Sequence, residues 1–117
     1  MSMLQKVNLL DAANATKGLY VYDAVGKLNG GVVSVVRVEN RTLDFHVHKH
    51  SDELFLVLEG SFTVETDDGQ ITLAPGEMVI VPKGMRHRPV VTSLVKVMQI
   101  ELEGTLNKQN SGALYEA

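Results

Sequence analysis

Short apolar segments alternate with polar turns along most of the chain. Alternation and β-branched residues predict strands at 31–38, 42–50, 53–58, 61–66, 70–73, 78–81, 86–92 and 94–101. Turn signals separate these segments, among them Asp67-Asp68-Gly69, Ala74-Pro75-Gly76 and Pro82-Lys83-Gly84. One short strand about every 8 to 12 residues favours an all-β sandwich or barrel.

The two ends of the chain are less regular. Residues 20–24 predict an edge strand and residues 8–16 at most a short helical turn, so we expect 1–30 to form an arm or edge of the fold. From residue 104 the composition turns polar, which predicts a loose tail, or an arm over a neighbouring subunit, at 104–117. At 117 residues the chain has the length of one domain, expected to span 1–117.

Composition argues against several classes of partner. A net charge of -3 offers no positive excess to hold nucleic acid or an anionic membrane. The longest apolar run, 54–58, is far short of a membrane span, and the N-terminal stretch does not resemble a signal peptide, so we expect a cytoplasmic protein. The absence of cysteine removes thiolate metal sites and cysteine nucleophiles.

A cluster of histidines carries the chemical information. His46, His48 and His50 alternate along one predicted strand and so share a face, with Glu53 shortly after them. His87 is the remaining histidine that could join them. Imidazole nitrogens and a carboxylate suit divalent iron, manganese, nickel, zinc, cobalt or copper. Histidines on a solvated hairpin edge are the alternative, and spacing alone leaves it open.

Two motifs around these histidines resemble those of the cupin family. The first family motif is matched by the run His46-Val47-His48, Glu53 and Gly60, with Asn40 where the family usually has glycine. The second family motif is matched by Gly76, Pro82, Gly84 and His87, with Val91 where the family usually has asparagine. Together the motifs cover residues 40–91.

The resemblance implies a double-stranded β-helix, a jelly-roll barrel, with His46, His48, Glu53 and His87 as ligands of a divalent transition metal ion. It also implies a homodimer, whose second subunit we expect to cover the apolar face formed by Leu54, Leu56 and Leu58. Phe55 and Val57, which share the parity of Glu53, are expected to line the interior.

Other polar and sulfur-containing residues near the motifs are interpreted more simply. His50 is expected at the rim or in solvent, with contact to a substrate as the alternative. Arg86 and Arg88 alternate away from His87, which favours solvated or interface arginines over a clamp for a substrate carboxylate. Met85 and Met98 are expected to fill the core.

A divalent ion held by three neutral imidazoles and one carboxylate keeps a positive charge, which favours small oxygen-rich or anionic ligands. We therefore expect a metal-dependent enzyme acting on such a metabolite, of the dioxygenase or isomerase kind. A non-catalytic module that binds or senses a small molecule or sugar is the alternative, and a metal-independent structural remnant is a third.

Overall fold

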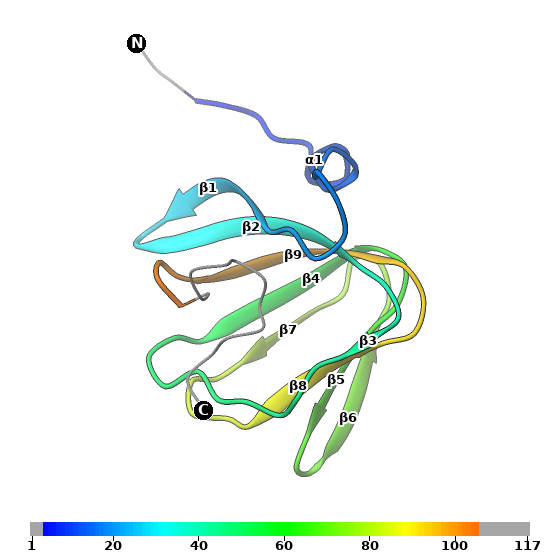
Figure 1. Ribbon diagram of the computed structural model, residues 1–117. Helices are drawn as coiled ribbons and strands as arrows, with labels where there is room; N and C mark the ends of the chain where they lie inside the picture. The colour runs from blue at the N-terminus through cyan, green and yellow to red at the C-terminus, as the bar shows by residue number, and fades with distance from the viewer. Residues whose placement is uncertain (1–3, 106–117) are drawn as a thin grey trace.

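Two antiparallel sheets face each other in the computed structural model of the chain, which describes residues 4–105 (Figure 1). One sheet has the order β1-β2-β9-β4-β7 and the other β3-β8-β5-β6. The expected all-β jelly-roll fold is thus confirmed. The elements are α1 (Leu9–Asn14), β1 (Asp23–Leu28), β2 (Gly31–Val38), β3 (Arg41–Thr42), β4 (Glu53–Glu59), β5 (Phe62–Thr66), β6 (Gly69–Leu73), β7 (Met78–Val81), β8 (His87–Val91) and β9 (Val95–Leu102).

Alternation along the strands builds the core between the sheets. Phe55 and Val57 of β4 are buried, as their parity predicts, and Phe55 packs on Phe62 of β5 with ring centroids 5.0 Å apart. Val64 of β5 and Val97 of β9 belong to the same cluster. Full burial of each such side chain contributes about 1.5–3 kcal/mol, so this layer is the main stabilising element around the site.

Helix α1 covers part of the opposite face of the five-stranded sheet. It is one regular helix of six residues, longer than the single turn expected, and Asn8 caps it by accepting a hydrogen bond from the Asp11 amide at 2.9 Å. The fully buried Ala13 packs in the same cluster as Leu54, Leu56 and Leu58. The chain therefore supplies from its own N-terminal region some of the cover expected from a second subunit.

Three local predictions were wrong. The strand expected over 42–50 is reduced to the two residues of β3, Arg41–Thr42. Farther along this segment, an isolated β-bridge joins His46 to His87. The edge strand expected at 20–24 lies at Asp23–Leu28, because Tyr20 takes a positive φ of 66° that interrupts extended backbone. Met85 is 42% exposed instead of buried. Beyond Thr105 the expected polar tail lies outside the described residues.

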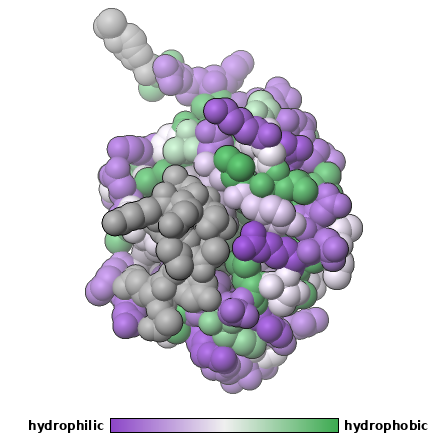
Figure 2. All heavy atoms as spheres, in the orientation of Figure 1, coloured by the Kyte–Doolittle hydropathy of each residue, from purple (hydrophilic) through white to green (hydrophobic). Residues whose placement is uncertain are grey.

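A close contact fixes the turn between β4 and β5. Gly60 has a φ of +93°, and a Cβ there would lie 2.6 Å from the backbone oxygen of Leu94. Only glycine fits this approach without displacing the start of β9. Polar residues dominate the face of the molecule shown in Figure 2, with apolar residues in scattered groups. None of the helices within residues 4–105 combines the length and apolar character needed to cross a bilayer.

Candidate metal centre

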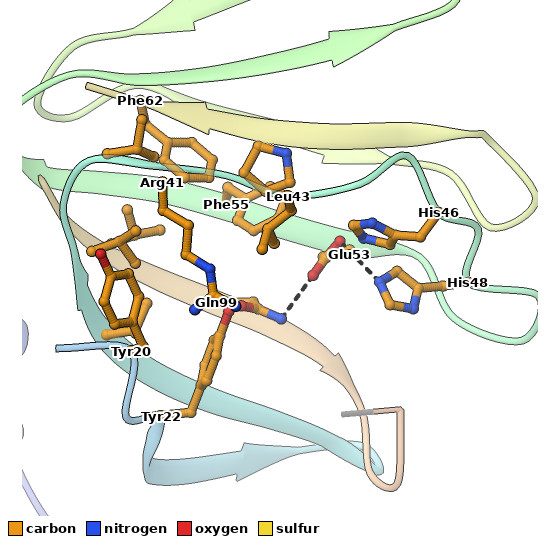
Figure 3. A pocket seen from close by; sticks show the side chains of 15 residues that line it. Tyr20, Tyr22, Arg41, Leu43, His46, His48, Glu53, Phe55, Phe62 and Gln99 are labelled. Carbon is orange, nitrogen blue, oxygen red and sulfur yellow. Dashed lines mark hydrogen bonds and ion pairs between the residues drawn. The ribbon is translucent and has the colours of Figure 1, made fainter. Parts of the chain in front are cut away.

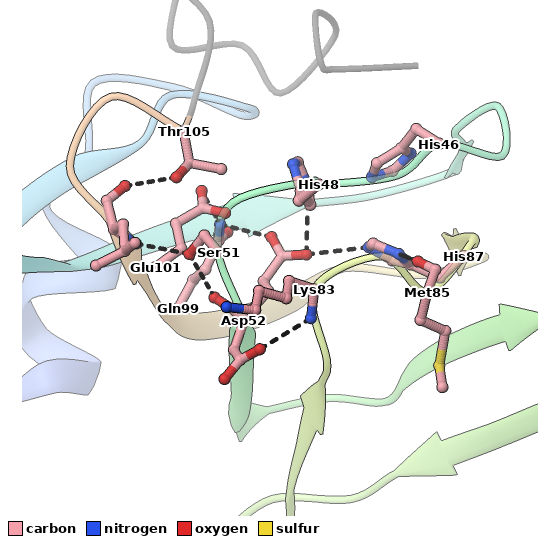
Figure 4. Close-up of polar contacts among 12 residues, drawn as sticks. His46, His48, Ser51, Asp52, Lys83, Met85, His87, Gln99, Glu101 and Thr105 are labelled. Carbon is pink, nitrogen blue, oxygen red and sulfur yellow. Dashed lines mark hydrogen bonds and ion pairs between the residues drawn. The ribbon is translucent and has the colours of Figure 1, made fainter.

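Four buried side chains converge at one end of the space between the sheets (Figure 4). His46 and His48 come from the segment after β3, Glu53 opens β4, and His87 opens β8. One ligand atom from each lies within 4.8 Å of the other three. Glu53 Oε1 is 3.0 Å from His87 Nε2 and 3.5 Å from His48 Nε2. The structure thus brings together the four residues that the sequence singled out.

Backbone contacts orient the imidazoles. His46 and His87 exchange two backbone hydrogen bonds, which tie the two motif segments together at 2.9 and 3.0 Å. The Nδ1 atoms of the same two residues lie 2.9 Å from the carbonyl oxygens of Asp44 and Met85. A ring whose Nδ1–H donates to a carbonyl presents an unprotonated Nε2 to the centre of the cluster, the form that coordinates a metal.

Burial also keeps the imidazoles neutral. It lowers the pKa of His48 to about 4, with a further contribution from the neighbouring His46 and His87 rings. Burial likewise lowers the pKa of His46 and of His87. At neutral pH the cluster therefore presents unprotonated nitrogens without first losing protons.

Glu53 belongs to a buried network that the sequence analysis did not identify. Gln99 Nε2 donates to Glu53 Oε2 at 2.8 Å and to Glu101 Oε1 at 2.6 Å (Figure 4). Burial raises the pKa of Glu53, and burial together with the Glu53 charge raises the pKa of Glu101. The alternation Val95, Val97, Gln99, Glu101 was the available signal, because it sets two polar residues at inward positions of an otherwise apolar strand.

The donor set fits a divalent transition metal ion. Ligands at right angles, each about 2.1 Å from an ion, lie about 3.0 Å apart, and opposite ligands about 4.2 Å apart. The separations of 3.0 and 3.5 Å, within an overall limit of 4.8 Å, require only a small contraction to reach this geometry. Three neutral nitrogens and one carboxylate oxygen are also the donors that such ions prefer.

A pocket leads from these residues toward β2 and β3 (Figure 3). His46, His48, Glu53 and Gln99 form its polar end. Most of its wall is apolar, supplied by Val36, Val38, Leu43, Phe55, Phe62, Pro89, Val91 and Val97. Tyr20, Tyr22 and Arg41 complete the lining. The sequence analysis missed these three residues as well, because they precede or open the motif region and nothing local relates them to the histidines.

His50, Arg86 and Arg88 lie outside the cluster, as the sequence analysis expected. His50 is exposed and does not belong to the group of four. Arg86 and Arg88 stack on Phe45, with guanidinium carbons 4.1 and 4.4 Å from the ring centroid, and neither lines the pocket. Arg88 also pairs with Glu65 at 2.7 Å. These contacts identify the two arginines as surface residues.

Comparison with known proteins gives two relatives of 35% and 27% identity. The chain is 35% identical over 89 residues to the uncharacterised protein YdbB of Bacillus subtilis, covering 75% of this chain and 76% of that protein. It is 27% identical over 74 residues to the tetracenomycin polyketide synthase protein TcmJ of Streptomyces glaucescens, covering 63% of this chain and 50% of that protein. The matched region thus spans half the length of the second relative.

Solved structures and the family match agree with the fold. A cupin-2 domain containing protein of Shewanella frigidimarina aligns with a TM-score of 0.77 and 31% identity, covering 83% of this chain and 94% of that one. A protein of Neisseria meningitidis aligns with a TM-score of 0.74 and 28% identity, covering 85% of this chain and all of that one (100%). The cupin domain family matches residues 34–101, which include every residue of the four-residue cluster. The chain belongs to the cupin domain family.

Proposed function

We propose that this chain is a metal-dependent enzyme of the dioxygenase or isomerase kind that acts on a small oxygen-rich or anionic metabolite. The observation that carries the proposal is the convergence of four buried donor atoms at the end of a largely apolar pocket. His46, His48, Glu53 and His87 would hold the ion. Once bound there, a divalent ion supplies Lewis acidity toward an oxygen of the ligand.

The rest of the chain positions these groups. Gln99 fixes one oxygen of Glu53 and leaves the other facing the imidazoles. The carbonyls of Asp44 and Met85 hold two rings in the coordinating tautomer. Three neutral imidazoles and one carboxylate leave a divalent ion with a net charge of about +1, which attracts an anionic or enolic oxygen into the pocket. The apolar walls exclude water around it and strengthen that attraction.

The name of one relative supports a carbonyl-rich substrate. The Streptomyces glaucescens relative is named as a protein of a polyketide synthase, and polyketide chains carry repeated carbonyl groups. Such oxygens are the donors that a partly coordinated divalent ion accepts.

Turnover on simple compounds tests the proposal. Protein loaded in turn with iron, manganese, nickel, cobalt and zinc is incubated with 1,3-diketones, 2-oxo acids and catechols. Oxygen uptake identifies dioxygenase activity, and exchange of carbon-bound hydrogen in deuterium oxide, followed by NMR, identifies isomerase-type proton transfer. We expect one of these activities with the wild type and none with His48→Ala. No activity with any metal on all three classes would contradict the enzyme proposal.

A binding or sensing role is the second candidate, and the pocket lining favours it. Apart from the cluster itself, the titratable lining residues are Tyr20, Tyr22 and Arg41. Burial raises the pKa of Tyr22, so its hydroxyl is a poor general base. Saturable binding of these compounds by the metal-loaded protein, with neither oxygen uptake nor hydrogen exchange, would support this role over catalysis.

We also propose that the chain forms a homodimer through β7. This strand ends the five-stranded sheet, and Met78 and Ile80 on it are 54% and 49% exposed. Exposed apolar residues on an unpaired edge favour pairing with a second chain. Light scattering should give a dimer for the wild type and for Gln70→Lys, but a monomer for Ile80→Lys. A specific dimer should still be associated at a chain concentration of about 100 µM. A wild-type monomer at this concentration would therefore contradict the proposed dimer.

A further inference from the structure

The pocket contains a positively charged side chain in addition to the four-residue cluster. Arg41 opens β3, where its backbone pairs with Val91 of β8, and its side chain runs across the pocket between Tyr20 and Tyr22 (Figure 3). Its guanidinium carbon lies 4.7 Å from the centroid of the Tyr20 ring. Arg41 therefore has a defined position inside the pocket.

Strained backbone holds the tyrosine that supports this arginine. Tyr20 has a φ of 66°, a conformation that costs a non-glycine residue free energy. Its amide donates to Arg37 O at 2.8 Å and its hydroxyl donates to Glu39 O. These two bonds stabilise the strained conformation and place the ring face beneath the guanidinium. Strain retained where a side chain is aimed into a pocket is typical of a functional constraint.

Arg41 has no protein counter-ion in the part of the chain that the structure describes. No carboxylate of residues 4–105 lies within 4.0 Å of its guanidinium, whereas Arg86 and Arg88 each pair with one. A half-buried guanidinium next to apolar walls loses hydration and gains little from the Tyr20 ring alone. Its planar donors match a carboxylate, which would supply the missing negative charge.

Tyr22 adds a second donor to the same end of the pocket. Burial raises the pKa of Tyr22, which keeps its hydroxyl protonated, and the ring extends toward Arg41 and Gln99 (Figure 3). Tyr22 lines the same pocket as Arg41 and the cluster, so its hydroxyl can donate to an oxygen of a ligand that reaches both.

We propose that Arg41 binds the carboxylate of a small substrate whose opposite end carries the oxygen donor for the metal centre, with the hydroxyl of Tyr22 donating to the ligand between them. This inference rests on the proposed function and deepens it by naming the substrate class: a carboxylic acid with a short apolar body and a second oxygen function. The aliphatic and aromatic walls between the two charged ends fit such a body. Two separated positive groups also select against neutral sugars.

Binding of dicarboxylates to the cobalt-loaded protein tests this inference. Malonate, succinate and glutarate form a length series, and their monoamides keep one carboxylate while replacing the other. Calorimetry measures affinity, and the visible spectrum of cobalt reports whether the ion is contacted. Azide, which can bind the metal but carries no carboxylate for Arg41, is the reference ligand.

We expect one dicarboxylate to bind best and its monoamide to bind about tenfold to a hundredfold more weakly, the loss that one charge-assisted contact represents. Arg41→Gln should weaken the dicarboxylate by a similar factor and leave azide binding unchanged. Arg41→Lys, which keeps the charge but not the planar donors, should fall between them. Lys27→Gln removes the same charge from an exposed site on β1 and should change neither affinity.

The possible failures are distinguishable. If azide binds the wild type normally and Arg41→Gln and Arg41→Lys both keep full dicarboxylate affinity, the role of Arg41 is refuted while the metal site stands. If the protein takes up no cobalt, both the proposed function and its extension to Arg41 are refuted. Unfolding of Arg41→Gln is detected by circular dichroism, and Arg41→Lys, which retains the side-chain stem over Tyr20, then decides the question.

Discussion

Replacing His48 with alanine should remove metal binding and leave the fold intact. The His48 ring is buried, yet its Nδ1 has no hydrogen-bond partner among the described residues. Its backbone oxygen accepts from the Gly84 amide at 2.8 Å, a bond that alanine keeps. Because a buried unpaired nitrogen costs about 1–3 kcal/mol, its removal offsets most of the packing lost with the ring. We expect a change in unfolding free energy of about 1 kcal/mol or less.

His87→Ala should behave differently. It breaks the contact of Nδ1 with Met85 O and leaves Glu53 Oε1 without its 3.0 Å partner inside the core. Losing the hydrogen bond to Met85 O and leaving the buried Glu53 carboxyl without its imidazole partner should together lower the unfolding free energy by about 2–4 kcal/mol. The two ligand variants should therefore lose metal alike but differ in the stability of the metal-free protein.

Thermal unfolding with and without metal measures both effects. A metal at a hundred times its Kd stabilises the folded wild type by about 2.7 kcal/mol, which raises Tm by about 10 °C for a domain of this size. His48→Ala should show almost no shift, and elemental analysis should find most of the metal gone. His50→Ala, the matched control on the same segment, should keep both. Full metal content and a full shift in His48→Ala would refute the assignment, as would their loss in His50→Ala alone.

Three further predictions follow from the buried carboxyls and the tight turn. Burial and Glu53 raise the folded pKa of Glu101 from 4.5 to about 9, so its contribution to stability is present below pH 4.5 and is lost as pH rises toward 9. The unfolding free energy of the metal-free protein should therefore fall across this range by about 1.4 kcal/mol per pH unit and per proton. Urea unfolding at several pH values measures this dependence, and Glu101→Gln should make it flatter. An unchanged pH dependence in Glu101→Gln would contradict the prediction. Because the pKa of Glu53 is raised to about 8, metal binding at pH 7 should release about one proton and the metal affinity should fall as pH falls. Calorimetry in buffers of different ionisation enthalpy measures the released proton. Binding heats that do not depend on the buffer would argue against this release. Gly60→Ala should lower the unfolding free energy by about 2–4 kcal/mol, because it combines a positive φ with the clash against Leu94. Gly76→Ala, which has a positive φ but open space around it, should lower it by about 1 kcal/mol. Equal losses of Tm in the two variants would contradict the close contact at Gly60.

Cytoplasmic location, the homodimer and the extent of the single domain stay predictions. The surface available for a dimer contact is smaller than the sequence suggested, because α1 covers part of the apolar face over β4. The exposed residues on β7 are the candidate contact.

The sequence by itself determined the local features. Period-two alternation placed Phe55 and Val57 inside, since the backbone of a strand sends neighbouring side chains to opposite faces wherever that strand is located. The types and spacing of the histidines and Glu53 indicated metal chemistry, because imidazole nitrogens and a carboxylate oxygen are donors that divalent transition metals prefer. Turn glycines and prolines marked most strand boundaries, since their allowed φ values are intrinsic to the residue.

Only the tertiary structure decided which distant residues complete the site. Pairing of β4 with β9 sets Phe55 opposite Gln99, and this register brings Gln99 and Glu101 to Glu53. Pairing of β3 with β8 sets Arg41 opposite Val91, and both residues line the pocket. Such contacts depend on long-range strand register and on irregular backbone, which are fixed by the packing of the whole barrel and leave no periodic signal in any one segment.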